Sequence, residues 1–212
     1  MLNQRLLACA EFVQGNFICD VGTDHAQLPI YLVKNQVAQK AIACDVREGP
    51  LQAAEKNITQ AGLKEQIQTI LSDGLQNVPD KALTDIVIAG MGGETIIHIL
   101  ETCPFSLKTI NLILQPMSKA ELLRKWLYQH HFEIQQEICI PDKQFLYAIM
   151  QVNYTELNAI PEVSEIYFGK MNLNYPDCRA YAQRVIRQLR KANFHPTPEL
   201  SELISTLEEK LT

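Results

Sequence analysis

The sequence predicts an α/β fold in which a mostly parallel sheet is closed by an antiparallel hairpin and followed by a helical appendage. Over the first half of the chain, compact β-prone segments alternate with helical ones, which is typical of a parallel sheet. Two strand-like segments then follow one another directly, and the last quarter carries helical periodicity alone. We therefore expect a sheet-forming domain at residues 1–155 and a helical domain at residues 156–212.

The composition is that of one sizeable folded domain with an extension. The 212 residues are 47% hydrophobic and 20% charged, as in ordinary globular proteins and unlike disordered or disulfide-rich chains. The N-terminus lacks the pattern of a signal peptide, and no apolar run approaches the roughly 18 residues that a membrane span requires. These features predict a cytoplasmic protein with no membrane partner.

The cysteines indicate neither a metal site nor a disulfide framework. Six are scattered through the chain without a C-x-x-C pair, and no histidine stands at the spacing of a zinc ligand. We expect reduced thiols and no metal, with Cys19 and Cys44 buried in strands.

The first two strand and helix units are apolar runs that end in turn residues. An amphipathic opening helix at residues 6–13 precedes a strand at 17–21, and a helix over 28–35 follows with its proline in the first turn. The unit repeats as a strand at 41–46 and a helix over 49–62, which ends at a glycine. Two such units in series predict parallel strands.

Three further strands are expected, each ending in a polar or glycine-rich loop. The strands are residues 67–71, 85–89 and 110–114, and their loops are residues 72–74, 90–93 and 115–116. Ser118 and Glu121 then have the spacing of a capping box, in which each side chain satisfies a backbone donor at a helix start. A helix is therefore expected to begin there and to run through Leu127.

A hairpin completes the sheet. Residues 132–140 and 145–152 are strand-like and flank the turn sequence 141–144. Seven strands, mostly parallel and closed by an antiparallel hairpin, are the layout of class I Rossmann-like methyltransferases. This comparison is an analogy at the level of the fold.

The C-terminal quarter predicts a helical hairpin that resembles a short coiled coil. Its first helix has candidate packing positions at Val185, Ile186 and Leu189, and Thr197 and Pro198 are the expected N-cap and first position of its second helix. The apolar face of the last helix comprises Leu200, Leu203, Ile204, Leu207 and Leu211. The turn between the helices includes His195 and Pro196.

Polar residues at the strand ends predict a cofactor site, because ligands of open parallel sheets bind at the carboxyl edge. Asp20 ends the first strand, Gly22 allows a tight turn and a close approach, and Asp45 ends the second strand 25 positions later. The loop lacks the second and third glycines that cradle a pyrophosphate. Carboxylates suit a cationic sulfonium and ammonium, so the loop favours S-adenosylmethionine over NAD, with Asp73 placed to contact the adenine amino group.

Each of these acids has a structural alternative, because Asp and Gly are common after strands as turn formers. Taken singly, any one of them is more often a turn residue than a ligand. The set as a whole predicts the cofactor site.

The loop Gly90-Met91-Gly92-Gly93 lacks the Asn/Asp-Pro-Pro-aromatic motif that is typical of enzymes that methylate exocyclic amino groups. A ring nitrogen such as adenine N1 already holds an in-plane lone pair, so it requires alignment and no deprotonation. Alternatively, the glycines, and Gly93 in particular, simply close a tight strand-to-helix turn.

Several of these motifs, taken in order, resemble the TrmK family, the bacterial tRNA (adenine(22)-N(1))-methyltransferases. The matching segments are Asp20-Val21-Gly22-Thr23-Asp24-His25-Ala26 with Leu28-Pro29, Asp45-Val46 with Gly49-Pro50-Leu51, Gly90-Met91-Gly92-Gly93, and Gln115-Pro116. They span most of residues 1–153. The resemblance implies an S-adenosylmethionine-dependent enzyme that methylates N1 of adenine 22 in tRNA.

The resemblance also assigns expected roles to residues. Those expected to bind the cofactor are Asp20, Gly22, Thr23, Asp24, His25, Asp45, Val46, Asp73, Gly74, Gly90, Met91 and Gly92. Those expected to border the adenine and carry the reaction are Asp24, Met91, Gln115 and Pro116. Asp24 would stabilise the cationic methylated base or hold the amino group of the cofactor, and His25 is secondary. Gln27 stands where a tyrosine is usual in the family, which weakens an expected stacking platform.

The net charge of −5 requires any RNA contact to come from a local patch. The expected patch comprises Arg179, Arg184, Arg187, Arg190 and Lys191, with a merely solvated helix face as the alternative. The target adenine would have to be flipped out. A methyltransferase of a small molecule or protein, and a non-catalytic RNA-binding protein on the same fold, remain alternatives. An NAD-dependent oxidoreductase is disfavoured.

Overall fold

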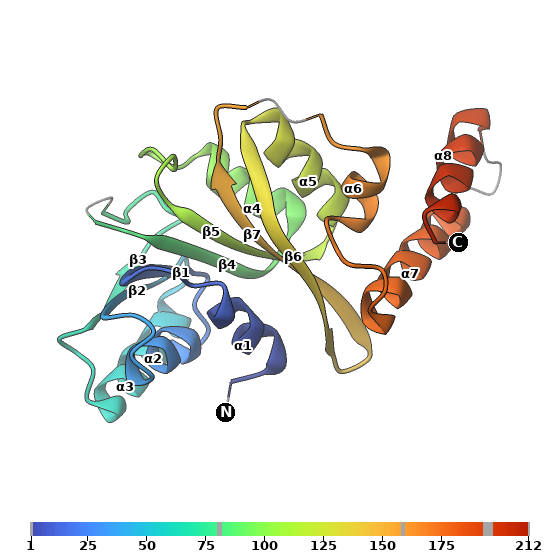
Figure 1. Ribbon diagram of the computed structural model, residues 1–212. Coiled ribbons are helices and arrows are strands. Elements are labelled where there is room, and N and C mark those ends of the chain that lie inside the picture. The colour runs from blue at the N-terminus through green and yellow to red at the C-terminus, as the bar shows by residue number, and fades with distance from the viewer. Residues whose placement is uncertain (1, 80–81, 158–159, 193–196, 212) are drawn as a thin grey trace.

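The computed structural model describes residues 2–79, 82–157, 160–192 and 197–211, and its centre is a twisted seven-stranded sheet (Figure 1). The strands are β1 (Phe17–Val21), β2 (Lys40–Asp45), β3 (Ile67–Leu71), β4 (Asp85–Gly92), β5 (Asn111–Ser118), β6 (Phe132–Asp142) and β7 (Phe145–Tyr154). The helices are α1 (Gln4–Glu11), α2 (Gln27–Lys34), α3 (Glu48–Ala61), α4 (Gly93–Glu101), α5 (Ala120–Gln129), α6 (Val163–Phe168), α7 (Pro176–Ala192) and α8 (Pro198–Glu209).

The strand order is β3-β2-β1-β4-β5-β7-β6. Strands β1 to β5 pair in parallel, whereas β7 is antiparallel to both of its neighbours. The predicted mostly parallel sheet with a terminal hairpin is therefore confirmed. The chain runs outward from β1 to β3 and crosses back to β4, so the topological switch point lies between β1 and β4.

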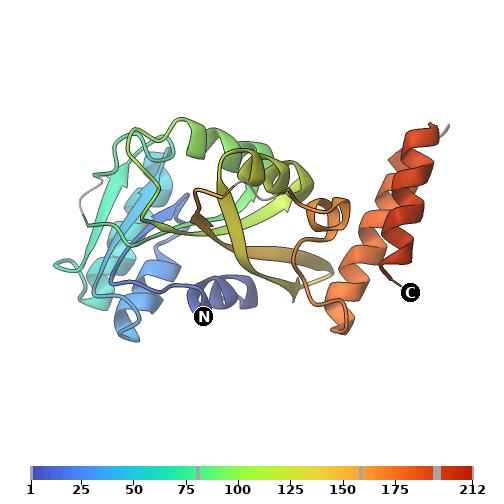
Figure 2. The ribbon, with the colours of Figure 1, turned by 45° about the horizontal axis from the view of Figure 1, so that its top comes forward.

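Helices cover both faces of the sheet (Figure 2). Alternate strand residues point to opposite faces, so that Ile18 packs with α1, α2 and α3, whereas Cys19 packs with α4 and α5. Cys19 and Cys44 are fully buried and free, as expected. Within the described ranges, no helix has the length and apolar character to cross a membrane, and no cluster of His, Cys, Asp or Glu could hold a metal ion.

Strands β4 and β5 are longer than the sequence predicted, and this corrects two assignments. Gly90, Met91 and Gly92 belong to β4, and Gln115-Pro116 lies within β5. Pairing continues past the expected strand ends, with Met91 opposite Pro116, because β-bulges absorb the irregular backbone. The glycines therefore mark a bulged strand end and not a loop, although Gly93 does begin α4 as a tight strand-to-helix turn requires.

The predicted capping box at Ser118 and Glu121 is wrong. Ser118 is the last residue of β5, paired with Gly92, and α5 begins two residues later. Lys119 is the N-cap in a left-handed conformation, with a φ of 54°, and no side chain caps the helix. Long-range strand pairing therefore outcompetes the local capping signal.

The last two helices, α7 and α8, lie side by side at one end of the molecule (Figures 1 and 2). Ile186, Ile204 and Leu207 are buried between these two helices and α6. The other predicted apolar positions are partly buried against this cluster: Val185, Leu189, Leu200, Leu203 and Leu211. Thr197 caps α8 by accepting a hydrogen bond from the Leu200 N–H at 3.3 Å, as predicted. His195 and Pro196 lie outside the described residues. The coiled-coil character and the domain boundary at residues 155/156 stay predictions.

Candidate functional site at the carboxyl edge of the sheet

The ends of β1, β2, β3 and β4 form one continuous edge. The backbone N–H groups of Gly22 and Thr23 both donate to the Cys44 carbonyl, at 2.8 and 2.9 Å. The Ser72 N–H donates to the carbonyl of Asp45 at 3.0 Å. These bonds continue the sheet into its loops and bring the predicted acids of β1 and β2 to the same edge.

Asp20 is a buried carboxylate at the switch point. Only 6% of the residue is exposed, and one carboxylate oxygen accepts a 2.7 Å hydrogen bond from the Thr23 hydroxyl. Burial raises the pKa of Asp20 from 3.8 to about 6, against the lowering effect of the Thr23 bond and with a further rise from Asp24 and Asp45. Thr23 is itself buried, and its hydroxyl holds the Asp20 carboxylate in position. Its expected role in binding the cofactor stays a prediction.

Asp45 presents a second buried carboxylate, 7% exposed. Its Oδ1 accepts a 2.8 Å bond from the Arg47 N–H, and the guanidinium of Arg47 lies 3.7 Å from the same atom. Beside it, Val46 is 60% exposed, and Leu71 at the end of β3 is 48% exposed. An exposed aliphatic pair next to a fixed carboxylate suits an adenosine, whose base is apolar on its faces and whose ribose donates hydrogen bonds.

The loop after β3 contributes Asp73 and Gly74. Asp73 is exposed, whereas Gly74 is buried in a left-handed conformation with a φ of 55°. A β carbon on Gly74 would stand 3.0 Å from the Ile99 side chain on α4. Packing against α4 therefore fixes the loop, and Asp73 projects from it.

Met91 connects the ends of β1 and β4. Its Cε occupies the space that a β carbon on Gly22 would fill, and Gly22 has a left-handed φ of 74°. Gly90 is also left-handed, with a φ of 83°, and a β carbon there would stand 3.2 Å from the guanidinium of Arg5. Both glycines therefore have a backbone conformation that disfavours a side chain, and each lies close to the flexible end of a neighbouring side chain.

Gln115 holds the end of β4 in place. It is fully buried, and its amide oxygen accepts a 2.9 Å bond from the Gly90 N–H and a second bond from the Arg5 guanidinium. Its amide nitrogen donates to the Pro116 carbonyl at 2.9 Å. Both ends of the amide are thus engaged inside the protein, and Pro116 is buried beside it.

The comparisons with known proteins agree with this architecture. Residues 2–150 match a family model described as a methyltransferase domain. The tRNA (adenine(22)-N(1))-methyltransferase of Bacillus subtilis is 36% identical over 151 residues, which are 70% of this chain and 63% of that enzyme, slightly less than two thirds of its length. A solved structure from Streptococcus pneumoniae, in complex with S-adenosyl-L-methionine, is 36% identical, covers all of both chains and has a TM-score of 0.90.

A TrmK structure from M. capricolum, in complex with S-adenosyl-homocysteine, is 31% identical with a TM-score of 0.84. The match covers 100% of this chain and 98% of the M. capricolum chain. The chain belongs to the TrmK family. The resemblance drawn from the strand-end motifs is therefore confirmed at the level of the family.

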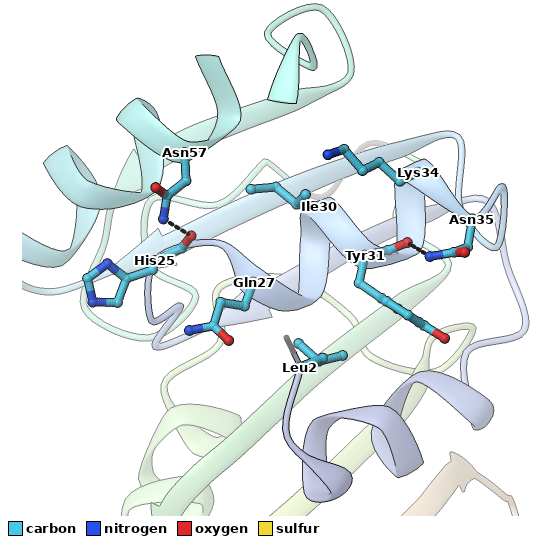
Figure 3. Close-up of a pocket in the computed structure, with 8 residues that line it drawn as sticks. All are labelled: Leu2, His25, Gln27, Ile30, Tyr31, Lys34, Asn35 and Asn57. Carbon is cyan, nitrogen blue, oxygen red and sulfur yellow. Dashed lines mark hydrogen bonds between the residues drawn. The ribbon is translucent and has the colours of Figure 1, made fainter. Parts of the chain in front are cut away.

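In this TrmK-family chain, Asp24 and His25 lie at the rim of the site. The Asp24 side chain is 79% exposed and the His25 side chain 50% exposed, with Nε2 of His25 3.1 Å from Oδ1 of Asp24. His25 and Ala26 both adopt left-handed backbone, with φ of 59° and 54°. Asn57 on α3 donates a 3.0 Å bond to the His25 carbonyl (Figure 3). Two consecutive strained residues, held by a neighbouring helix, are typical of a functional loop.

Gln27 begins α2. It lines a shallow hollow of about 410 Å³ with His25, Tyr31 and Lys34 (Figure 3). The ring of Tyr31 borders the same hollow one helical turn further along α2.

The five predicted basic residues on α7 do not form one free face. Arg179 bonds the Leu211 carbonyl, Arg190 pairs with Glu208, and Arg184 donates to the Leu146 carbonyl at 2.6 Å. Arg187 and Lys191 are exposed and make no such bond within the described residues, and Arg179 and Arg190 are exposed as well. Three of the five cations on this helix therefore bond to other segments of the protein, two of them at the surface.

Arg5 is a site residue that the sequence reasoning missed. Its guanidinium reaches Gln115 and Gly90 from α1, and lies 3.8 Å from Asp142 on the hairpin. No local motif marks Arg5. Its position on the apolar face of α1 was a signal that could have indicated a buried polar partner.

Proposed function

We propose that this protein transfers the methyl group of S-adenosylmethionine to N1 of adenine 22 in tRNA. The observation that carries the proposal is the set of groups at the switch point. Two buried carboxylates, Asp20 and Asp45, stand with the exposed Val46 and Leu71 around a turn at Gly22, whose left-handed backbone disfavours a side chain. This set fits a cationic adenosine derivative and would repel a pyrophosphate.

The residues present fit the cofactor in each of its parts. Asp45 could accept hydrogen bonds from the ribose hydroxyls, Val46 and Leu71 could cover the adenine, and the exposed Asp73 could contact the adenine amino group. Asp20, with the Gly22 turn, would face the cationic methionine portion. When bound, the cofactor supplies an electrophilic methyl group on a sulfonium, suited to direct in-line displacement by a ring nitrogen.

On the acceptor side, the chain has to align the adenine and stabilise charge. N1 of adenine needs no base, because its lone pair is available at neutral pH, so alignment is the main requirement. The product carries a positive charge, and the exposed carboxylate of Asp24 would stabilise it. Met91 would border the adenine, whereas the buried Gln115 and Pro116 would act by fixing the end of β4.

The tRNA substrate would present its adenine unstacked, because N1 lies on the Watson–Crick edge. Arg187 and Lys191 are the exposed members of the predicted basic set that bond to no other segment within the described residues, so they would be free for phosphate contact. Helices α7 and α8 would form a tRNA-binding appendage to the catalytic domain. A tRNA substrate would place the protein in the cytoplasm.

The test is methyl transfer from labelled S-adenosylmethionine to two unmodified tRNA transcripts, one with adenine at position 22 and one with guanine. Incorporation only into the adenine transcript, with kcat at least tenfold lower in Asp24→Asn, is expected. Incorporation into neither, with cofactor binding intact by calorimetry, would refute the tRNA assignment and favour a small-molecule or protein acceptor. Failure to bind the cofactor would favour a non-catalytic RNA-binding protein.

A further inference from the structure

We propose that three adjoining hollows form one track for the RNA strand that carries the target adenine, with Phe145 and Tyr147 as the residues that stack on its bases. The inference rests on the proposed function and deepens it. It assigns base-stacking residues to the β6–β7 hairpin, which the predicted site did not include.

The hollows adjoin because they share walls. The central hollow, about 510 Å³, shares Gln27 with the hollow of Figure 3. It shares Met117, Phe145 and Tyr147 with a larger one of about 750 Å³ that extends to Arg184 and Gln188 on α7. One surface path therefore runs from α2, past the C-terminal end of β5 and the β6–β7 hairpin, to α7.

The centre of this path has exposed apolar side chains. Phe145 is 48% exposed and Met117 is 44% exposed. The rings of Phe145 and Tyr147 are tilted by 46° with centroids 6.1 Å apart, so neither ring covers the face of the other. Open aromatic faces at the rim of a hollow are the usual platforms for unpaired bases.

The path also carries more positive than negative charge, in a chain whose net charge is −5. The cations that line the three hollows are Arg5, Lys34, Lys119, Lys143 and Arg184. The carboxylates are Glu121 and Asp142. Lys119 is paired with Glu94 at 2.6 Å and Arg5 lies near Asp142, which leaves Lys34, Lys143 and Arg184 without a carboxylate partner in the described part of the chain.

Two guanidinium groups on the path have unused donors. Nε of Arg5, in the central hollow, and Nε of Arg184, in the larger one, are buried without a hydrogen-bond partner among the described residues. Arg184 is held in place by Tyr181, whose ring centroid lies 5.2 Å from its guanidinium carbon. Cations without a carboxylate partner beside open rings match a strand that alternates negatively charged phosphates with flat bases, whereas a peptide backbone carries no such charge.

The test measures the kinetics and the cofactor-free tRNA binding of Phe145→Ala and Tyr147→Ala. We expect the KM and the Kd for tRNA to rise about tenfold in each variant, as for loss of one stacked base, while the Kd for S-adenosylmethionine and the melting temperature stay unchanged. Phe145→Trp should retain tRNA affinity and Phe145→Leu should lose it, because stacking requires a ring. Tyr175→Ala is the matched control, since this aromatic residue is 63% exposed and lines none of the three hollows.

The outcomes separate the track from the proposed function. Normal tRNA affinity in both alanine variants, or retained affinity in Phe145→Leu, would overturn the track even if methylation of adenine 22 proceeds. Conversely, tRNA binding that weakens in these variants, without methyl transfer by the wild type, would support the track and refute the proposed function.

Discussion

The Cε atom of Met91 occupies the space that a β carbon on Gly22 would need. This contact joins the ends of β1 and β4 at the switch point of the sheet. Gly22→Ala should therefore displace the flexible end of Met91 and add backbone strain at a φ of 74°. We expect the cofactor affinity to fall at least tenfold and the free energy of unfolding to fall by about 2–3 kcal/mol, as measured by calorimetry and by denaturant titration.

Gly62→Ala separates strain from steric conflict. Gly62 has a nearly identical φ of 73°, but a β carbon there would meet nothing within 4 Å. Its replacement should cost only about 1 kcal/mol and leave cofactor binding unchanged. Equal losses in both variants would show that the Met91 contact contributes nothing.

The raised pKa of Asp20 predicts that cofactor binding depends on pH. Burial is the main cause of the rise to about 6, and a cationic ligand favours the ionised carboxylate. Below about pH 6 the apoprotein must release a proton to bind, so affinity should fall by up to about tenfold per pH unit. Calorimetry between about pH 5 and 7 checks this, and Asp20→Asn should bind weakly without this pH dependence. A flat profile in the wild type would contradict the prediction.

The same pKa shift has an opposite consequence for stability. Because the folded pKa of Asp20 is above the unfolded value near 3.8, its stabilising contribution is complete below that value and is lost as the pH rises through about 6. At neutral pH the buried charge therefore costs stability. At pH 7 the free energy of unfolding of Asp20→Asn should exceed that of the wild type by up to about 3 kcal/mol, and its melting temperature should be higher. Both differences should vanish near pH 4.

Gln115 should affect the cofactor through the backbone of β4. Gln115→Ala removes the acceptor of the Gly90 N–H and of Arg5, which should cost about 1–3 kcal/mol of stability and weaken cofactor binding several-fold. The control is Gln151→Ala. Gln151 is also buried, and it bonds Asn111 at 3.1 Å at the opposite end of β5. Its loss should cost similar stability with cofactor affinity unchanged, and weakened binding in both variants would indicate a merely structural role for Gln115.

The sequence predicted the buried part of each central strand well, because apolar β-prone runs are local signals. The bounds of β1 and β3 agree residue for residue with the prediction. Convergence of Asp20 and Asp45 followed from topology alone, since parallel strands end at one edge. Strand ends were less predictable. Gly90 has a left-handed φ, which suits a turn and a bulge equally, and the pairing of Met91 with Pro116 decides between them.

Other features had no local signal at all. Arg5 contacts a glutamine 110 positions away, and no short pattern encodes that distance. Ser118 has a valid capping sequence that a strand partner at Gly92 overrides. The hollows along the hairpin likewise depend on how α1, α2 and α7 pack around it. Features that depend on neighbouring residues could be predicted from the sequence. Contacts between segments far apart in the chain could be found only in the structure.

A buried ion pair connects helices α6 and α7 to the sheet. Arg124 on α5 bonds Glu137 on β6 at 2.7 Å, and both side chains are fully buried. The same guanidinium donates to the carbonyls of Ile166 and Tyr167 on α6, at 3.0 and 3.1 Å, and to the hydroxyl of Tyr181 on α7. One side chain thus joins four elements.

Glu137→Gln should leave the Arg124 charge buried without a counterion. Truncating one member of a buried pair typically costs about 3–5 kcal/mol, and here the loss should loosen α6 and α7. We expect faster amide hydrogen exchange in both helices and a large drop in melting temperature. Glu133→Gln is the control, because its pair with Lys170, at 3.3 Å, is partly exposed and should contribute less than about 1 kcal/mol. If both variants lose equal stability, or exchange in α6 and α7 is unchanged, Arg124 is not the anchor of these helices.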